Sequence, residues 1–216
     1  MRYYIAHNIE TPYGDYSDII YSGYICTFYF EKIEHVYNNV KVFKEEMRDL
    51  DIAEVWRTGP YVPDIYMAAN GFAMTEIFMK KLMNSGLKGI NNLKPTVKKK
   101  IINLPWKSWS KEDWENHIEE LHEPEDSLEY GEHDEVLANS MPNIFYFIPM
   151  TVEKCKLSIE NEDSYNERFV LDETPDLDVF MASNMLFCIV SDNFKKFLDE
   201  NTEDRLLYNE IYMQQP

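Results

Sequence analysis

The chain has 216 residues with 39 Asp and Glu against 21 Lys and Arg, so its formal net charge is -18 with the histidines neutral. Its content of 44% hydrophobic residues excludes a disordered acidic tail, and its length favours one large domain or two small ones. The longest apolar runs, 144–150 and 185–190, are far shorter than the roughly 18 to 20 residues of a membrane span. The start, MRYYIAHNIETPYGD, has no apolar core of a standard secretory signal. We therefore expect a soluble, cytoplasmic globular protein.

The three cysteines agree with that compartment. Cys26, Cys155 and Cys188 are widely spaced and form no CxxC pair, so the sequence does not indicate a redox or zinc site. Cys26 and Cys188 lie in apolar runs, where a free cysteine usually behaves as a small buried hydrophobe.

The first quarter of the chain is rich in candidate strands. Residues 3–6 form a short extended run, 24–30 are β-branched and aromatic enough for a central strand, and 51–57 are a third candidate. Between them, the apolar residues of 31–49 lie at spacings of 4, 3 and 4, which favours a helix there.

A second helix is predicted to begin at Ser110. Ser110 and Asp113 resemble a capping box, an apolar face follows, and Pro124 ends the helix. The next stretch, 123–135, is too charged to be core and is expected to be an exposed acidic loop. Further strands are predicted at 143–150, 156–159 and 168–171.

The charge is divided between two adjacent segments. Residues 77–110 hold eight lysines and no acid, and residues 111–135 hold 12 acids and one lysine. Either the two segments pack against each other, or the acidic one faces outward to meet a basic partner. The overall negative charge repels nucleic acid and anionic lipid, so the predicted partner is a basic protein. The candidate partner-binding residues are Glu119, Glu120, Glu123, Glu125, Asp126, Glu129, Glu132, Asp134 and Glu135.

Two segments about 114 residues apart are similar, 63–86 and 175–201. Each is expected to be an extended approach followed by a short helix with an N-cap at Thr75 or Ser191. Gly86 and Asn201 suit left-handed caps, and 205–213 alternates loosely as a terminal strand would. The matched blocks are Pro63-Asp64 with Pro175-Asp176, Met67 to Asn70 with Met181 to Asn184, and Thr75, Glu76, Phe78 and Leu82 with Ser191, Asp192, Phe194 and Leu198.

The second segment also carries a family resemblance. The run Val190 to Leu198, the approach Pro175 to Phe180 and the closing strand are similar to the C-terminal pattern of Imm11-like immunity proteins of bacterial polymorphic toxin systems. The resemblance covers roughly 175–213 and, in part, 63–93. It implies a protein that binds a cognate toxin made in the same cell and blocks it. The matched positions are expected to be structural, so the resemblance assigns no binding residue.

Enzyme motifs are sparse in this sequence. It contains no GxGxxG, GxxxxGK[ST], GxSxG or HExxH pattern. A metal-dependent hydrolase would have to use the cluster His117, Glu120, His122, Glu123 and His133, although His117 and His122 lie about 140 degrees apart on a helix. The aromatic cluster Trp106, Trp109 and Trp114 favours a core or interface anchor over stacking on nucleic-acid bases.

These observations predict an α+β fold of mixed strands and short helices, with two copies of a strand-helix module. Residues 1–216 are expected to form a single compact domain, possibly two packed halves, 1–109 and 110–216. The predicted function is neutralisation of a cognate toxin domain by binding, without catalysis, cofactor or metal. The alternatives are an acidic nucleic-acid mimic that inhibits a DNA-binding protein, and a hydrolase that uses His117, Glu120, His122 and His133.

Overall fold

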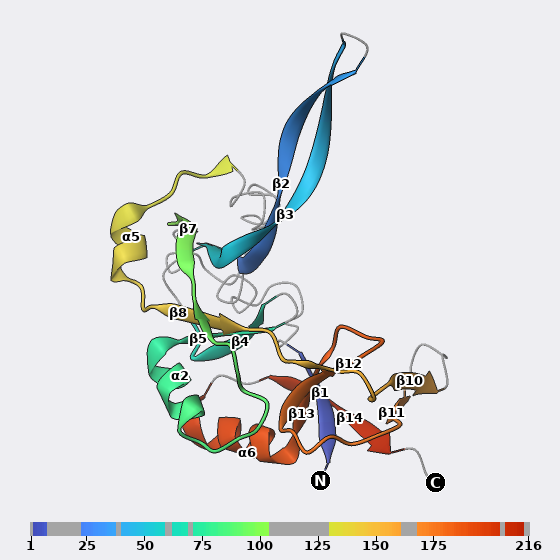
Figure 1. The fold of residues 1–216 in the computed structure, drawn as a ribbon. Helices are drawn as coiled ribbons and strands as arrows, with labels where there is room; N and C mark the ends of the chain where they lie inside the picture. The colour runs from blue at the N-terminus through green and yellow to red at the C-terminus, as the bar shows by residue number, and fades with distance from the viewer. Residues whose placement is uncertain are drawn as a thin grey trace, which may run out of the picture.

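The computed structural model describes residues 2–7, 23–37, 40–58, 62–68, 71–103, 130–160, 168–203 and 206–213. This part of the chain is mostly β-strand, with three short helices, α2 (Glu76–Met83), α5 (Glu135–Ser140) and α6 (Asp192–Asn201) (Figure 1). The predicted mixture of strands and short helices is therefore confirmed. Among the described helices, none combines the length and the apolar character that crossing a membrane requires.

The largest described sheet is curled and mixed, and six of its seven strands come from the C-terminal half of the chain (Figure 1). In spatial order its strands are β10 (Leu157–Glu160), β11 (Arg168–Leu171), β14 (Leu207–Met213), β1 (Tyr3–His7), β13 (Cys188–Ser191), β12 (Val179–Ala182) and β9 (Thr151–Val152). Two pairs are parallel, β11 with β14 and β12 with β9, and the other pairs are antiparallel. The strands predicted at 3–6, 156–159, 168–171 and 205–213 are confirmed with small shifts of their ends.

Two smaller sheets complete the described fold. The first has the order β4 (Ile65–Ala68), β5 (Gly71–Thr75), β8 (Ile144–Phe147) and β6 (Lys94–Pro95). The second has the order β2 (Gly23–Tyr37), β3 (Val40–Thr58) and β7 (Val97–Ile102). Strand β8 confirms the centre of the strand predicted at 143–150.

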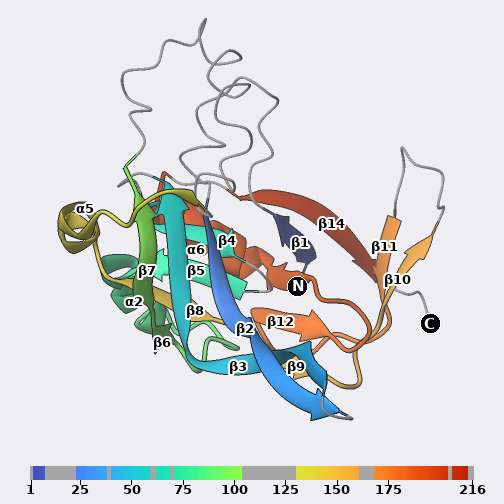
Figure 2. The same cartoon turned by 90° about the horizontal axis from the view of Figure 1, so that it is seen from above.

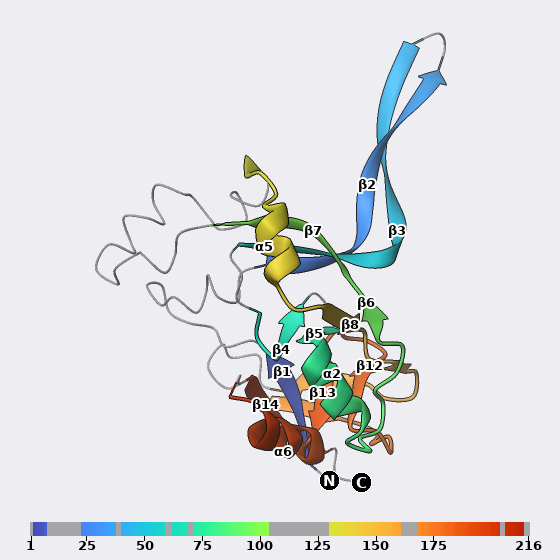
Figure 3. The same ribbon diagram turned by 90° about the vertical axis from the view of Figure 1, so that its left-hand side faces the viewer.

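The long hairpin of β2 and β3 corrects two predictions. Residues 31–49 were expected to be helical, but they pair as antiparallel strands as far as Tyr37 and Val40. The alternation of β-branched residues with charged ones is compatible with a β-strand as well as with a helix. Here the pairing with a second strand stabilises the β-hairpin. The strand at 24–30 was expected to be central, but β2 lies at the edge of its sheet. The distal half of the hairpin projects away from the rest of the described fold (Figure 3).

Two units of the fold have the same strand order. An antiparallel pair, β4 and β5, leads into α2, and β12 and β13 lead into α6 in the same way. A third strand lies antiparallel beside each pair, β8 in the first unit and β1 in the second, and a fourth lies antiparallel beyond it, β6 or β14. We call these units module 1 (β4-β5-β8-β6 with α2) and module 2 (β12-β13-β1-β14 with α6).

Strand pairing crosses the boundary between residues 109 and 110 in both directions. Strand β8, from the C-terminal half of the chain, is the third strand of module 1. Strand β1, from the N-terminus, is the third strand of module 2.

The two modules share a hydrophobic core. The ring of Phe72 lies 5.5 Å from that of Phe194, and the ring of Phe78 lies 5.9 Å from that of Phe197. Both helices contribute buried side chains to this core, and both lie beneath the strands of module 1 in the view from above (Figure 2). The other face of the module 2 strands packs inside the curled sheet. The other face of the module 1 strands packs against β3, β7 and α5.

The predicted helix starts are confirmed in both modules. The Thr75 hydroxyl accepts a hydrogen bond from the amide of Phe78 at 3.3 Å, and the Ser191 hydroxyl accepts one from the amide of Phe194 at 3.2 Å. The four residues predicted to be buried are buried, namely Phe78, Leu82, Phe194 and Leu198. The helix ends differ from the prediction. Gly86 has a φ of 77°, but it follows the C-cap by two residues, and Asn201 is helical.

The structure also shifts one block of the sequence match by two residues. The carbonyl of Asp64 accepts from the amide of Thr75, and the carbonyl of Asp178 accepts from the amide of Ser191. The structural equivalent of Asp64 is therefore Asp178, and the match of Asp64 with Asp176 was wrong. A repeated Pro-Asp pair is a weaker guide than strand register, which here aligns DIYMA with DVFMA.

Candidate functional site

The structure places only the last acids of the predicted partner-binding segment. Glu132 and Glu135 are exposed, and Asp134 is partly buried. The other predicted residues, Glu119, Glu120, Glu123, Glu125, Asp126 and Glu129, lie outside the described residues. So do Trp106, Trp109 and Trp114 and the helix predicted from Ser110.

Asp134 holds the start of α5, a helix that the sequence did not predict. Its Oδ1 accepts a hydrogen bond of 2.8 Å from the amide of Leu137, which satisfies one of the free donors of the first turn. Its own amide donates to the carbonyl of Ile101 at 2.8 Å. Asp134 therefore caps α5 and joins it to β7.

His133 makes a second connection to the same strand. Its Nδ1 accepts a hydrogen bond of 2.9 Å from the amide of Ile101, and its Nε2 lies 3.0 Å from Oε2 of Glu135. Because Nδ1 is an acceptor, the proton of the neutral ring lies on Nε2 and is donated to Glu135. In this arrangement neither ring nitrogen offers a lone pair to a metal ion.

The other members of the proposed metal cluster cannot be compared with His133. His117, Glu120, His122 and Glu123 lie outside the described residues. Within the ranges that the structure describes, no three His, Cys, Asp or Glu side chains are grouped as metal ligands would be.

Lys98 secures the other end of α5. Its Nζ donates to the carbonyls of Ala138 and Met141, both at 2.7 Å. A cation at this position is favourable because the last carbonyls of a helix carry partial negative charge. Burial lowers the pKa of Lys98. With His133 and Asp134 at one end and Lys98 at the other, α5 is attached to β7 at both ends.

Six of the seven lysines described in the basic segment contact other groups of the described chain. Lys99 contacts Glu54 at 3.7 Å, and the Nζ of Lys100 lies 5.6 Å from the centre of the Trp56 ring. The remaining contacts are Lys80 with Glu76, Lys81 with the carbonyl of Asn201, Lys88 with Asp176, and Lys98 with the two carbonyls of α5. In the described structure, none of these contacts is an ion pair with the acidic segment 111–135.

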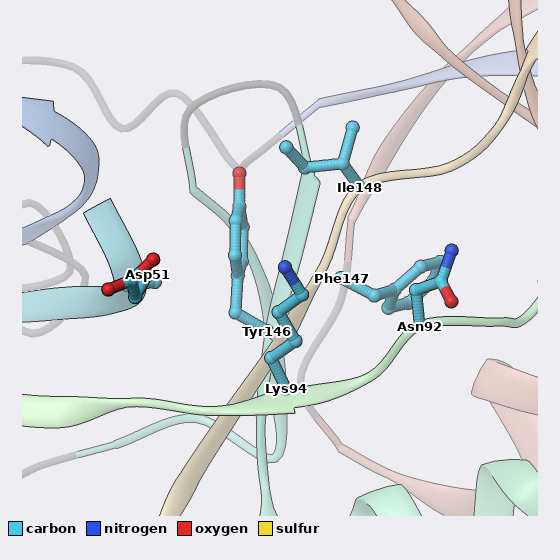
Figure 4. Close-up of a pocket in the computed structure, with 7 residues that line it drawn as sticks. Asp51, Asn92, Lys94, Tyr146, Phe147 and Ile148 are labelled. Atoms are coloured by element: carbon cyan, nitrogen blue, oxygen red, sulfur yellow. The ribbon is translucent and has the colours of Figure 1, made fainter. Parts of the chain in front are cut away.

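A pocket of about 450 Å³ lies where the hairpin meets β6 and β8 (Figure 4). Its polar side chains are Asp51 on β3, Asn92 and Lys94 on β6 or just before it, and Tyr146 on β8. Its apolar side chains are Ala53, Phe147 and Ile148. Figure 4 shows Asp51 on one side of the Tyr146 ring and Lys94 and Asn92 on the other. This mixed lining is typical of sites that orient a ligand by a few polar contacts.

Tyr146 lines this pocket, but its hydroxyl is enclosed in the described fold. Tyr146 is only 4% exposed, and its hydroxyl has no hydrogen-bond partner among the described residues. Burial raises its pKa, so the phenol is neutral at physiological pH. A buried hydroxyl without a partner costs about 1 to 3 kcal/mol.

Module 2 provides an internal comparison for this position. Tyr146 pairs with Ala73, two residues before Thr75, and Ile5 pairs with Ile189, two residues before Ser191. The structural equivalent of Tyr146 is therefore Ile5, which is fully buried in the apolar core of the curled sheet. Module 1 thus has a polar group where module 2 has an apolar one.

Little in the sequence indicated this pocket. Tyr146 was predicted within a buried strand, where a tyrosine is most often a core residue, and Lys94 was one lysine of a basic segment. Asp51 was the first residue of a predicted strand. The three come from separate strands, so only the tertiary structure brings them together. Comparison with models of protein families, with curated proteins and with solved structures found no match.

Proposed function

We propose that this chain is an immunity protein, which binds a cognate bacterial toxin domain with a basic surface and neutralises it in the cytoplasm. Inhibition follows from occlusion of the active site or substrate surface of the toxin, so it requires no catalytic residue or cofactor in this chain. We infer that modules 1 and 2 are copies of one structural unit, from which the immunity fold is built.

The observation that carries the proposal is the way the charges are distributed. Six of the seven lysines described between 80 and 100 contact other groups of the described chain, and Glu132 and Glu135 are exposed just before and at the start of α5. Because α5 is attached to β7 at both ends and Nε2 of His133 lies 3.0 Å from Oε2 of Glu135, the Glu135 carboxylate is held in a defined place before a partner arrives. Preorganised charge lowers the entropic cost of binding, and negative charge of this kind accelerates the approach of a basic protein.

The segment that resembles Imm11-like proteins supports the same proposal. Ser191 caps α6, and Asp192 lies in its first turn, where a carboxylate interacts favourably with the helix dipole. Phe194 and Leu198 are buried in the core that the two modules share. The matched residues therefore have structural roles, which leaves the surface free to differ between proteins that bind different toxins.

The projecting hairpin is the second feature that suits a binding protein. Two-stranded ribbons are marginally stable in water unless a third strand or another element packs on them. The edge of β2 offers backbone groups to an added strand, which is a common mode of protein recognition. We propose that the toxin contacts the side of the molecule that carries this hairpin and α5.

The experiment uses the protein encoded immediately upstream of this gene. Its C-terminal domain is produced in bacteria with and without the chain, and survival is measured. We expect the chain to restore growth and to form a complex with the purified domain in size-exclusion chromatography with light scattering. A domain that is not toxic, or a toxic domain that the chain neither binds nor blocks, contradicts the proposal.

A hairpin variant tests whether the hairpin belongs to the interface. Replacing residues 31–46 with a two-residue turn removes the distal ribbon and retains Ile25, Ala53 and Val55, which belong to the core at its base. We expect this variant to remain folded, with much weaker toxin binding. Full protection by the shortened chain would exclude the hairpin from the interface.

A further inference from the structure

We propose that, in the absence of toxin, the outer edge of β2 pairs with the same edge of a second copy of this chain. The pairing joins the two projecting hairpins into one four-stranded antiparallel sheet. This inference goes beyond toxin neutralisation and does not depend on it, because it concerns the chain alone. It rests on the position of β2 in its sheet and on the order of residues along this strand.

Strand β2 is a long edge strand. It has 15 residues, and within the described ranges β3 is the only strand that pairs with it. It contains no proline, and a register shift lies near its base, between Cys26 and Phe28. An edge of this kind presents a row of backbone donors and acceptors to a further strand. Because two-stranded ribbons are only marginally stable in water, a further strand would also stabilise the projecting hairpin.

The symmetry of a pair of identical edges limits its register. Two copies related by a two-fold axis pair the same strand with itself, in antiparallel orientation. Successive residues of a strand point to opposite faces of the sheet, so the axis has to pass through a residue that lies opposite its own copy. Every other residue then lies opposite the one that is equally far from this centre on the other side.

The sequence of β2 is complementary to itself about Ile33. Opposite charges or hydrogen-bonding groups face each other in two kinds of pair, and apolar or aromatic residues in two more. Each pair is formed twice, and they are Lys32 with Glu34, Glu31 with His35, Phe30 with Val36, and Tyr29 with Tyr37. Cross-strand pairs of these kinds stabilise a sheet.

The other symmetric registers near this centre lack such complementarity. Those centred on Glu31, Lys32 or Glu34 place two like charges directly opposite each other, which destabilises a sheet. The order of residues therefore selects the register that is centred on Ile33.

The placement of the hairpin permits this pairing. Residues 29–37 lie beyond the register shift, in the part that projects from the rest of the described fold (Figure 3). Residues 28–49 hold five acids and four bases, so the hairpin is almost neutral although the chain carries -18. Antiparallel pairing places the remainder of the two chains at opposite ends of nine paired residues. These span roughly 30 Å, more than three Debye lengths of about 8 Å, so the mutual repulsion is largely screened.

The first test measures the mass of the chain alone. Sedimentation equilibrium over a wide range of protein concentration should show a reversible dimer, whose mass approaches twice 25.7 kDa at high concentration. A chain that remains monomeric throughout overturns the proposal. Because no toxin is present, this result is independent of whether the chain neutralises one.

A charge exchange tests the register. Lys32→Glu and Glu34→Lys each place like charges opposite each other twice in the dimer, so each should raise the dissociation constant at least about tenfold. Lys44→Glu makes the same charge change as Lys32→Glu, but on β3 and away from the paired edge, and should leave the constant unchanged.

Restoration of the opposite charges separates loss of pairing from misfolding of the hairpin. An equal mixture of the Lys32→Glu and Glu34→Lys variants should dimerise again, because the mixed pair has opposite charges at both positions. One chain that carries both substitutions should dimerise as the wild type does. The proposal is overturned if the single variants dimerise normally, or if neither the mixture nor the double variant recovers the dimer.

A cross-link locates the centre of the pairing. In a Cys26→Ser background, Ile33→Cys places two cysteines opposite each other, with Cα atoms about 4.5 to 5.5 Å apart, which a disulfide can bridge. Val36→Cys places them about 20 Å apart along the strands, beyond that reach. Mild oxidation should therefore link only the Ile33→Cys chains covalently. Equal cross-linking at both positions, or none at Ile33→Cys, contradicts the register.

Discussion

The hydroxyl of Ser191 donates a hydrogen bond of 2.6 Å to Oδ1 of Asp178, and both residues are buried. The same carboxylate accepts from the side chain of Asn193 at 3.3 Å, and its Oδ2 accepts from the amide of Lys88 at 2.8 Å. Asp178 thus joins β12 to the start of α6 and to the loop that follows α2. One buried carboxylate connects both modules.

Removing this carboxylate should destabilise the protein strongly. Hydrogen bonds to charged groups contribute about 1.5 to 3 kcal/mol each, so we expect Asp178→Ala to lower the free energy of unfolding by at least about 3 kcal/mol. Asp176→Ala is the matched control. Its ion pair with Lys88 is exposed, and exposed pairs contribute at most about 1 kcal/mol. Urea unfolding of both variants checks this, and equal losses would reject Asp178 as the connecting residue.

Replacement of tyrosine by phenylalanine should change the free energy of unfolding differently at two buried positions, Tyr3 and Tyr146. Tyr3 donates to the carbonyl of Pro175 at 2.7 Å, so Tyr3→Phe should cost about 0.5 to 1.5 kcal/mol. The hydroxyl of Tyr146 has no partner in the described structure, so Tyr146→Phe should leave stability unchanged or increase it. Denaturant midpoints measured without added ligand compare the two. A larger loss for Tyr146→Phe would show that its hydroxyl is bonded within the protein.

The free energy of unfolding should fall at alkaline pH, because some buried groups lose their protons at a higher pH in the folded state than in the unfolded state. Burial raises the pKa of Cys188 from 9.0 to about 12 and that of Tyr3 from 10.0 to about 12. Groups whose pKa is raised in the folded state stabilise it fully below their unfolded pKa, and this stabilisation is lost as the pH rises through the folded pKa. The window therefore extends from about pH 9 to about pH 12.

The variant Cys188→Val tests the contribution of the thiol. It should flatten the decline of the unfolding free energy across this window, because valine has no proton to lose. Urea unfolding at several alkaline pH values measures the slope, with Glu210→Gln as the exposed control. An identical slope in wild type and Cys188→Val would show that the thiol does not contribute.

The acidic segment should determine how fast the toxin associates. Reversing Glu125, Asp126, Glu129 and Glu132 to Lys changes the net charge from -18 to -10, two units for each residue. Steering acts on association and is screened over a Debye length of about 8 Å at physiological ionic strength. We expect slower association and a flatter salt dependence, measured by stopped flow at several salt concentrations.

A control variant with the same net charge separates local from global effects. Reversing Glu153, Glu173, Glu203 and Glu210, which are exposed on the side of module 2, also changes the net charge to -10. This control should retain most of the association rate. If both variants slow association equally, the overall charge steers the partner and the acidic segment has no special place in the interface.

The sequence by itself determined the local features that depend on nearby residues. The caps at Thr75 and Ser191, the buried faces of α2 and α6, and most short strands could be predicted, because a hydroxyl three residues before an amide and an apolar i, i+4 pair act over one helical turn. The prediction from sequence was wrong at 31–49. The apolar residues there have helical spacing, but the structure is a β-hairpin whose hydrogen bonds depend on a second strand.

Only the tertiary structure decided which distant segments complete each module and what lies between them. Strand β1 joins β13, and β8 joins β5, because hydrogen bonding across a sheet depends on register and not on separation along the chain. The same pairing brings Asp51, Lys94 and Tyr146 to one pocket and makes Asp178, rather than Asp176, the equivalent of Asp64. Residues on three strands share a cavity only after the sheets have packed, and no local pattern in the sequence carries that information.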